Sequence, residues 1–97
     1  MPAPPQNFVG PNLGALRRAK GLTQAMLAAR CGLLGWDIGE NTITKIETQI
    51  RCLVDWELLC LAKALNIQVS ELFRPSGAMT DKAVRRHFNE LRSRLDL

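Results

Sequence analysis

The stretch GLTQAMLAARCG at residues 21–32 limits the folds open to this chain more than any other feature. Thr23 predicts the start of a helix, because its hydroxyl can accept a hydrogen bond from the free amides of the first turn. Leu27 and Ala28 give that helix a narrow apolar seam, and the small alanine lets a second helix approach closely. We expect Gly32 to end the helix in a left-handed conformation near residue 31.

A second short helix is predicted at residues 40–48, with Ile43 and Ile46 three residues apart on its buried face. Two short helices joined by a turn, the second with an outward polar face, describe a helix-turn-helix. Such a motif places its second helix in the major groove of DNA. The residues expected to face outward are Glu40, Asn41, Thr42, Thr44 and Lys45.

The remaining pattern is also helical, so we expect an all-α fold. Residues 1–8 hold three prolines and predict a flexible arm, followed by a domain at 9–74. The other predicted elements begin with a first helix from Gly10 or Asn12 to Lys20 and a loop at 33–39 packed through Trp36 and Ile38. A loop at 49–54 is expected to bury Leu53 or Val54, and a helix at 56–65 follows it, capped by Asp55 and stopped at Asn66, before a short helix at 70–73. The core residues of the helix at 56–65 are Leu58, Leu59, Leu61, Ala62 and Leu65.

The last segment, 75–97, predicts an amphipathic helix that begins after a Thr80 cap and ends near Leu95. Its apolar stripe has two readings: it folds back on the domain, or it packs against the same helix of a second chain. The second reading makes it a dimerisation element, formed by Val84, Phe88, Leu91 and Leu95.

Size and composition narrow the function classes. The chain has 97 residues, 46% of them hydrophobic and 23% charged, which suits one globular domain. Its apolar runs are too short for a membrane span, and its first residues lack the features of a signal peptide. Three cysteines without a Cys-x-x-Cys spacing argue against both a disulfide framework and a zinc site. We therefore expect a cytoplasmic protein with no cofactor, no metal and no membrane partner.

The charge is consistent with a nucleic-acid partner without requiring one. The net charge is +4, but residues 1–73 hold seven Lys and Arg against six Asp and Glu, which leaves the predicted DNA-binding part at only +1. Residues 74–97 hold six against three and supply the other +3. Plain solubility explains such a mild excess equally well.

The spacing of several fragments resembles the phage-repressor/Cro-type helix-turn-helix family, also called the XRE family. The likeness runs from Leu13 to Phe73 and is carried by the order of these fragments: Leu13-x-x-Leu16-Arg17, Lys20–Gln24, Leu27-Ala28, Cys31-Gly32, Thr42–Glu47, Leu58-x-x-Leu61–Leu65 and Ser70–Phe73. This resemblance implies a compact, lambda-repressor-like bundle of five helices that binds double-stranded DNA. It also implies a transcriptional repressor in a prokaryotic cytoplasm, acting as a homodimer on a palindromic operator and so associated with the nucleoid.

The resemblance also suggests residue roles. It implies that Gln24 holds a phosphate and braces the recognition helix, and that Glu47 pairs with Arg17 in the first helix, although Arg17 is also a candidate phosphate contact. Thr42 can reach a phosphate or a thymine methyl group, and backbone contacts are expected from Gln49 or Arg51. The positions that reach base edges in the family correspond to Glu40, Asn41, Thr44 and Lys45.

The chain departs from the family pattern in two places. The connection between the two helices of the motif is longer than the usual short turn, and the glycine and proline that commonly follow the glutamate are replaced by Gln49 and Leu53.

Two other binding functions stay open: the antitoxin of a toxin–antitoxin pair, which grips a toxin with its C-terminal segment, and an adaptor that no longer binds DNA. An enzyme is disfavoured, because the chain has one histidine, no nucleophile–base grouping and no phosphate-binding glycine loop.

Overall fold

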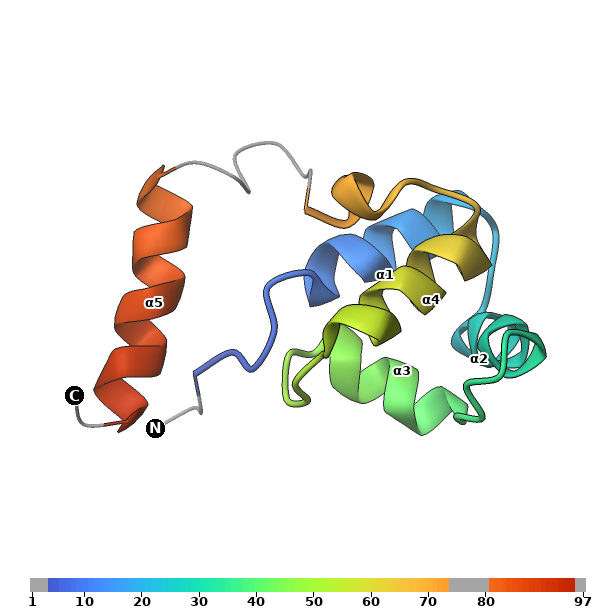
Figure 1. Cartoon of the computed structure of the whole chain (residues 1–97), viewed down its shortest axis with the longest axis horizontal. Helices are drawn as coiled ribbons and strands as arrows, with labels where there is room; N and C mark the ends of the chain where they lie inside the picture. The colour runs from blue at the N-terminus through green and yellow to red at the C-terminus, as the bar shows by residue number, and fades with distance from the viewer. Residues whose placement is uncertain (1–3, 74–80, 96–97) are drawn as a thin grey trace.

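The computed structural model describes residues 4–73 and 81–95 of the chain, and within these ranges it contains helices and no strand. The all-helical expectation is thus confirmed for this part. In chain order the elements are α1 (Gly10–Ala19), α2 (Gln24–Leu33), α3 (Glu40–Glu47), α4 (Asp55–Leu65), the 3-10 turn η1 (Val69–Phe73) and α5 (Asp81–Leu95) (Figure 1). No helix among the described residues has both the length and the apolar character needed to cross a bilayer.

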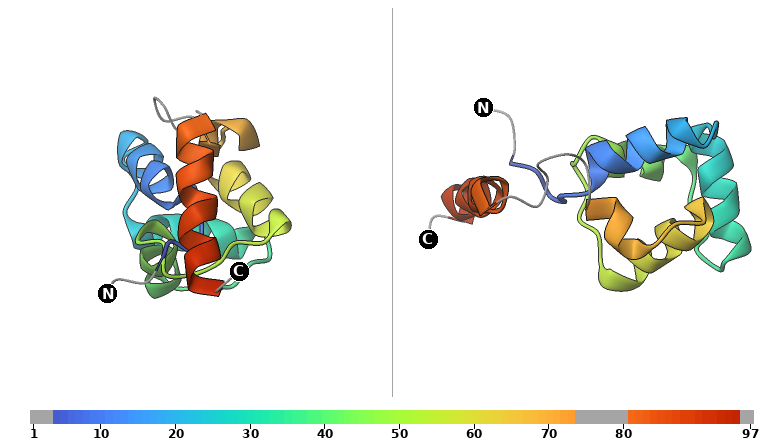
Figure 2. Two further views of the ribbon diagram at one scale, coloured as in Figure 1. Left: turned by 90° about the vertical axis from the view of Figure 1, so that its left-hand side faces the viewer. Right: turned by 90° about the horizontal axis from the view of Figure 1, so that it is seen from above.

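The first four helices and η1 form one body, and α5 lies at the end of its long axis (Figures 1 and 2). Helix α3 packs against α1 and α2, while α4 packs against α2 and η1. One contact between α5 and the rest is aromatic: His87 meets Phe8 edge-on, with ring centres 5.6 Å apart. Phe8 in turn stacks on Phe73 at the end of η1.

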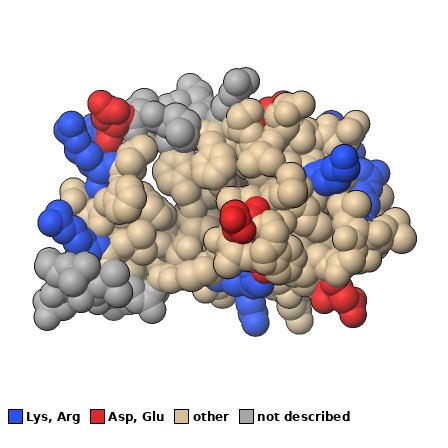
Figure 3. Space-filling model, viewed as in Figure 1, with Lys and Arg blue, Asp and Glu red and all other residues tan. Residues whose placement is uncertain are grey.

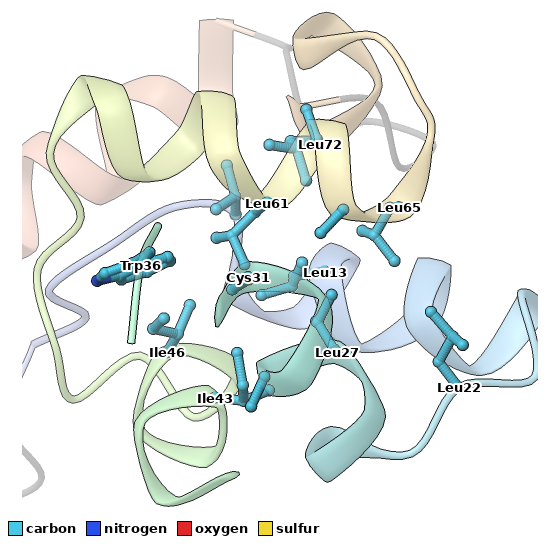
Figure 4. Packing of buried hydrophobic residues seen from close by; sticks show 14 residues of the cluster. Leu13, Leu22, Leu27, Cys31, Trp36, Ile43, Ile46, Leu61, Leu65 and Leu72 are labelled. Atoms are coloured by element: carbon cyan, nitrogen blue, oxygen red, sulfur yellow. The ribbon is translucent and has the colours of Figure 1, made fainter. Parts of the chain in front are cut away.

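Every element of the body contributes a fully buried aliphatic side chain to one core (Figure 4). Full burial of each such side chain is worth about 1.5–3 kcal/mol, so these residues dominate the stability of the bundle. The largest side chains without solvent exposure are Leu13 of α1, Leu27 of α2, Ile43 and Ile46 of α3, Leu61 and Leu65 of α4, and Leu72 of η1.

The helices α1 to α4 end in the same manner, with a left-handed residue and a hydrogen bond from the next amide to the carbonyl five residues before it. This is the Schellman motif, which satisfies carbonyls that the helix leaves without partners. The left-handed residues are Gly21 after α1, Gly35 after α2, Gln49 after α3 and Asn66 after α4, and the bonds run from Leu22 to Arg17, Trp36 to Cys31, Ile50 to Lys45 and Ile67 to Ala62. The expected stop at Asn66 is confirmed.

The end of α2 lies later than the sequence predicted. Gly32 is inside the helix, which continues to Leu33, and Gly35 makes the left-handed turn with a φ of +99°. The amide of Trp36 then donates to the carbonyl of Cys31 over 3.0 Å. The prediction was wrong because the turn has to lie where it directs the Trp36 side chain into the core, and that position is three residues beyond Gly32.

The start of α4 also differs from the prediction. Val54 precedes the first turn, and its amide is held by the carboxylate of Glu57 at 3.0 Å, so Asp55 is not the cap. Leu59 was expected in the core but is 60% exposed, since the face of α4 that packs inward includes Glu57 and Leu61. In the preceding loop Val54 is exposed, and Leu53 is the residue that packs partly against the core.

Within the predicted flexible arm, Gln6, Asn7 and Phe8 contact the body of the protein. Asn7 is buried, and its amide nitrogen donates to the carbonyls of Ile46 and Arg51 at 2.9 Å each. Its amide oxygen accepts from the backbone N–H of Gly10 at 2.8 Å and so caps the first turn of α1. Residues 1–3, the expected cap Thr80, and the side chain of Leu95 lie outside the described residues.

The close approach of α1 to α3 requires glycine at position 10. A Cβ atom there would overlap the carbonyl oxygen of Ile46 and lie 2.9 Å from Oδ1 of Asn7. We expect Gly10→Ala to lower the free energy of unfolding by about 2–3 kcal/mol, as overpacking against backbone does. Gly32→Ala is the matched control, because a Cβ there meets nothing within 4 Å and alanine favours a helix interior by about 1 kcal/mol. Urea unfolding measures both; equal stability of Gly10→Ala and wild type would disprove the packing argument.

Candidate nucleic-acid interface

Helix α3 separates its side chains into a buried face and an exposed polar face. Ile43 and Ile46 have no solvent exposure, which fixes the rotation of the helix about its own axis. Gly39 precedes the first turn in an extended conformation, and because glycine has no side chain it cannot cap the first amides of α3. The residues of the polar face are Glu40, Asn41, Thr44 and Lys45, all exposed, with Thr42 half-buried beside them.

Gln24 connects the start of α2 to this helix. The hydroxyl of Thr44 donates to Oε1 of Gln24 at 2.8 Å, and Nε2 of Gln24 donates to Oε1 of Glu47 at 3.2 Å. Both bonds join side chains that are about twenty positions apart in the sequence and on different helices. The bracing role suggested for Gln24 is therefore present in the structure.

Arg17 and Glu47 form the ion pair that the resemblance suggested. Nε of Arg17 lies 2.7 Å from Oε2 of Glu47, and Nη2 lies 3.1 Å from Oε1, a two-pronged contact. Nη1 donates to the carbonyl of Leu22 at 2.8 Å. The hydrogen bond to Glu47 is the main reason that the pKa of Arg17 is raised, with the charge of Glu47 adding to it and burial opposing it.

This placement determines what Arg17 can do. Its side chain is only 10% exposed, and its three nitrogens all have protein partners. Because a phosphate would have to replace Glu47, we assign Arg17 to positioning α3 and not to contacting DNA. Arg17 of α1 bonds to Glu47 of α3, Glu47 to Gln24 of α2, and Gln24 back to Thr44 of α3, so the four side chains form one continuous hydrogen-bonded chain; we call these four residues the bracing network.

Gln49 and Arg51 also take structural positions. Gln49 is the left-handed residue after α3, with a φ of +65°, and its side-chain amide donates to the carbonyl of Asn7 at 3.0 Å. Arg51 donates to both carboxylate oxygens of Glu57, at 3.0 and 2.8 Å, and its guanidinium lies 5.6 Å from the ring centre of Trp36. Neither side chain joins the polar face of α3.

Sequence reasoning missed the Arg51–Glu57 pair and the buried Asn7. A glutamate at the third position of a helix is a capping signal, but that signal normally includes a Ser or Thr three residues earlier, and here the residue is Val54. The burial of Asn7 has no local signal, since the carbonyls that its amide nitrogen binds lie about forty residues away. Both features hold the segment between α3 and α4 in place, because Asn7 bonds to the carbonyl of Arg51 and the side chain of Arg51 bonds to Glu57.

The Arg51–Glu57 pair makes the stability of the protein depend on pH. Arg51 is the main cause of a lowered pKa at Glu57, whose burial opposes the shift and whose bond from the Val54 amide reinforces it. A carboxylate with a lowered pKa contributes stability above its ordinary value of 4.5, and this contribution disappears as pH falls through the folded-state pKa. We expect the unfolding free energy to fall as the pH is lowered below 4.5.

Glu57→Gln is the matched variant for this titration, because it keeps the shape of the side chain and removes the charge. It should be less stable than wild type at neutral pH, and the difference should shrink as the solution is acidified. Urea titrations at a series of pH values measure the two curves. If the two curves stay parallel as the pH is lowered well below 4.5, Glu57 is not the group responsible.

The three cysteines lie in different environments: Cys31 is buried, Cys60 is half-buried and Cys52 is exposed. All three are free, and no group of three or more His, Cys, Asp or Glu side chains among the described residues is placed to hold a metal ion. Cys31 is buried next to Cys60; burial, and to a lesser extent the Cys60 neighbour, raises the pKa of Cys31 to about 12. A thiol with such a pKa stays protonated at neutral pH, so Cys31 acts as a small core residue.

The predicted dimerisation stripe is exposed where its side chains are described. Val84 is 36% and Phe88 63% exposed, and Leu91 is half-buried. The structure thus places two candidate surfaces on one chain, the polar face of α3 and the apolar stripe of α5. In comparisons with protein-family models, curated proteins and solved structures, nothing matches this chain.

Proposed function

We propose that this chain binds double-stranded DNA by placing α3 in the major groove and regulates transcription, as a repressor of the phage-repressor/Cro type. The observation that supports this most directly is the polar face of α3, where Asn41 and Lys45 are exposed on a helix anchored by Ile43 and Ile46. An eight-residue helix is about 12 Å long and about as wide as the groove that would receive it.

The side chains of this face have the chemistry needed to distinguish bases. Asparagine can pair with both N6 and N7 of adenine, lysine can donate to O6 and N7 of guanine, and glutamate can accept from N4 of cytosine. Glu40, Asn41 and Lys45 therefore give one half-site of the operator its sequence preference. Thr44 reads no base by this proposal, because its hydroxyl already bonds to Gln24.

The bracing network explains how so small a helix can read DNA. A recognition helix that moved would lose affinity, since ordering side chains on binding costs free energy. Gln24 accepts from Thr44 and donates one amide hydrogen to Glu47, which leaves its second amide hydrogen for a phosphate. In this proposal Gln24 therefore both holds α3 in position and contacts a phosphate of the DNA backbone.

Low charge makes pairing of two copies important. Residues 1–73 carry a net charge of only +1, and Glu40 repels phosphate unless it meets a base donor. One half-site contacted through a few side chains would bind weakly, so the proposal includes a homodimer on a palindrome with half-sites about 34 Å apart.

The direct test is selection from random-sequence duplexes, followed by fluorescence anisotropy on the enriched sequence at several salt concentrations. The proposal expects a palindromic motif, with affinity that falls only moderately with salt because few phosphates are neutralised. Enrichment of no motif, with binding that depends on salt alone, would contradict sequence-specific regulation and favour a protein adaptor.

A further inference from the structure

Helix α5 concentrates positive charge on one side. Successive residues of a helix are turned by about 100°, which places four cations of α5 within about 60° of Asn89 around the helix axis. The acidic residues of the helix, Asp81 and Glu90, lie about 80–100° from Asn89, at the edges of this surface. We call the surface the basic face of α5; its cations, all exposed, are Lys82, Arg85, Arg86 and Arg92.

The basic face points away from the rest of the protein. The half-buried residues on the opposite side of α5 lie at i, i+4 and i+8, and they are Ala83, His87 and Leu91. The ring of His87 identifies this side as the one that meets the body, because it packs edge-on against Phe8. Helix α5 stands at the end of the long axis of the molecule, and in Figure 3 Lys and Arg side chains project from that end, at the left.

The charge of the basic face is not neutralised within the protein. Among the described side chains the ion pairs are Arg17–Glu47 and Arg51–Glu57, and both belong to the body. Residues 81–95 hold five Lys and Arg against two Asp and Glu, a net charge of +3, whereas residues 1–73 have a net charge of +1. Helix α5 therefore carries most of the excess positive charge of the chain, and the cations of its basic face extend over about 15 Å.

A surface of this kind fits a polyanion in water. Double-stranded DNA carries one negative charge per about 1.7 Å of its axis, so it offers several phosphates over the length of the basic face. An arginine can donate two parallel hydrogen bonds to one phosphate, whereas a lysine meets it as a point charge. The three arginines are therefore the stronger phosphate ligands.

An anionic membrane surface fits less well. A helix that lies on a bilayer inserts its apolar side into the lipid. In α5 the apolar residues Val84, Phe88 and Leu91 lie about 100–160° from Asn89, so the side that faces away from the body has no apolar centre.

We infer that the basic face of α5 binds the phosphate backbone of double-stranded DNA through Arg85, Arg86 and Arg92, without regard to base sequence. This contact supplies an electrostatic attraction that the body, with its net charge of +1, does not provide. The choice of DNA as the polyanion rests on the proposed function, while the placement of the charge does not.

The double variant Arg85→Gln/Arg92→Gln tests this contact. The two arginines are seven residues apart, so they lie within about 20° of each other around the helix, and glutamine favours a helix about as well as arginine does. Loss of two phosphate contacts lowers the slope of log affinity against log salt concentration by about 1.8. The ratio of the affinities for a random-sequence duplex at 50 and 200 mM salt should therefore be about tenfold smaller than for wild type. Fluorescence anisotropy on the full chain measures both affinities.

Arg30→Gln/Lys63→Gln is the matched control, because it removes the same charge from exposed positions on α2 and α4. It should keep the salt dependence of the wild-type protein. Arg30 donates to the carbonyl of Ala64, so circular dichroism melting of both double variants is needed to show that each is folded under the assay conditions.

Three outcomes would overturn the inference. They are a wild-type chain that does not bind the random duplex even at 50 mM salt, an equal change in the two double variants, and an unchanged salt dependence in Arg85→Gln/Arg92→Gln. If that variant instead loses binding only to vesicles containing phosphatidylserine, the partner of α5 is a membrane surface.

Failure of the proposed function gives a different result. Selection would then enrich no motif, while Arg85→Gln/Arg92→Gln would still weaken binding to every duplex alike. The inference would be supported in that case, because the basic face reads no base.

Discussion

Glu47→Ala is expected to lower the free energy of unfolding by about 3 kcal/mol, among the largest losses that one substitution in this chain should cause. The change leaves the guanidinium of Arg17 without its ion partner in a side chain that is only 10% exposed. It also removes the acceptor of Gln24, which would then hold Thr44 without support from α1. Urea unfolding followed by far-ultraviolet circular dichroism gives the free energy directly.

Two controls separate the cost of an unpaired charge from the worth of the pair. The double variant Arg17→Met/Glu47→Leu replaces both partners with apolar side chains of similar size, and buried ion pairs replaced in this way often lose little stability. It should therefore be more stable than Glu47→Ala. A loss of less than ~1 kcal/mol for Glu47→Ala would show that solvent compensates Arg17, and that the bracing network is not a determinant of the fold.

Asn41→Ala is expected to weaken binding to the selected operator by about 10- to 100-fold while leaving stability unchanged. An asparagine paired with both acceptor and donor of an adenine is worth about 1–3 kcal/mol of discrimination, and Asn41 is exposed and makes no described contact that its loss would break. The effect should be confined to the base that Asn41 reads. On duplexes already mutated at that base, Asn41→Ala and the wild-type protein should therefore bind with nearly equal affinity. Anisotropy titrations against both duplexes measure this difference.

Lys45→Ala tests the same face through charge. It should reduce affinity for the selected operator about tenfold and relax the preference for guanine at the position that Lys45 reads. Lys82→Ala is the matched control, since it removes the same charge from an exposed position on α5. Equal losses from the two lysine variants would mean that net charge alone holds the DNA and would contradict the assignment of α3 as the recognition helix.

Local pattern was sufficient to predict most of the helices. Thr23 caps α2 through its hydroxyl, which accepts from the amide of Met26 at 3.1 Å, as its position before an apolar helix suggested. Ile43 and Ile46 are buried because residues three apart share one side of a helix. The polar face of α3 follows from the same spacing, since the remaining positions have to point away from the core.

Errors arose where a residue's position depends on contacts outside its own helix. Leu59 has a hydrophobic side chain typical of the core, but α4 is rotated so that Glu57 faces inward and pairs with Arg51, which leaves Leu59 exposed. Gly32 is a residue type that commonly ends a helix, but the left-handed turn after α2 is at Gly35, because Trp36 has to reach the core. In both cases a contact outside the helix overrides the local preference.

The amino-acid sequence by itself determined that the chain folds into helices, where most of them begin, and which side chains of α3 stay polar and outward, because these properties depend on spacing within a few residues. Only the tertiary structure decided that Arg51 is held by Glu57, that Asn7 is buried, and that the exposed Trp56 of α4 lies against the buried Trp36. Those outcomes depend on which helices pack together, and that is determined by burial of the whole core at once.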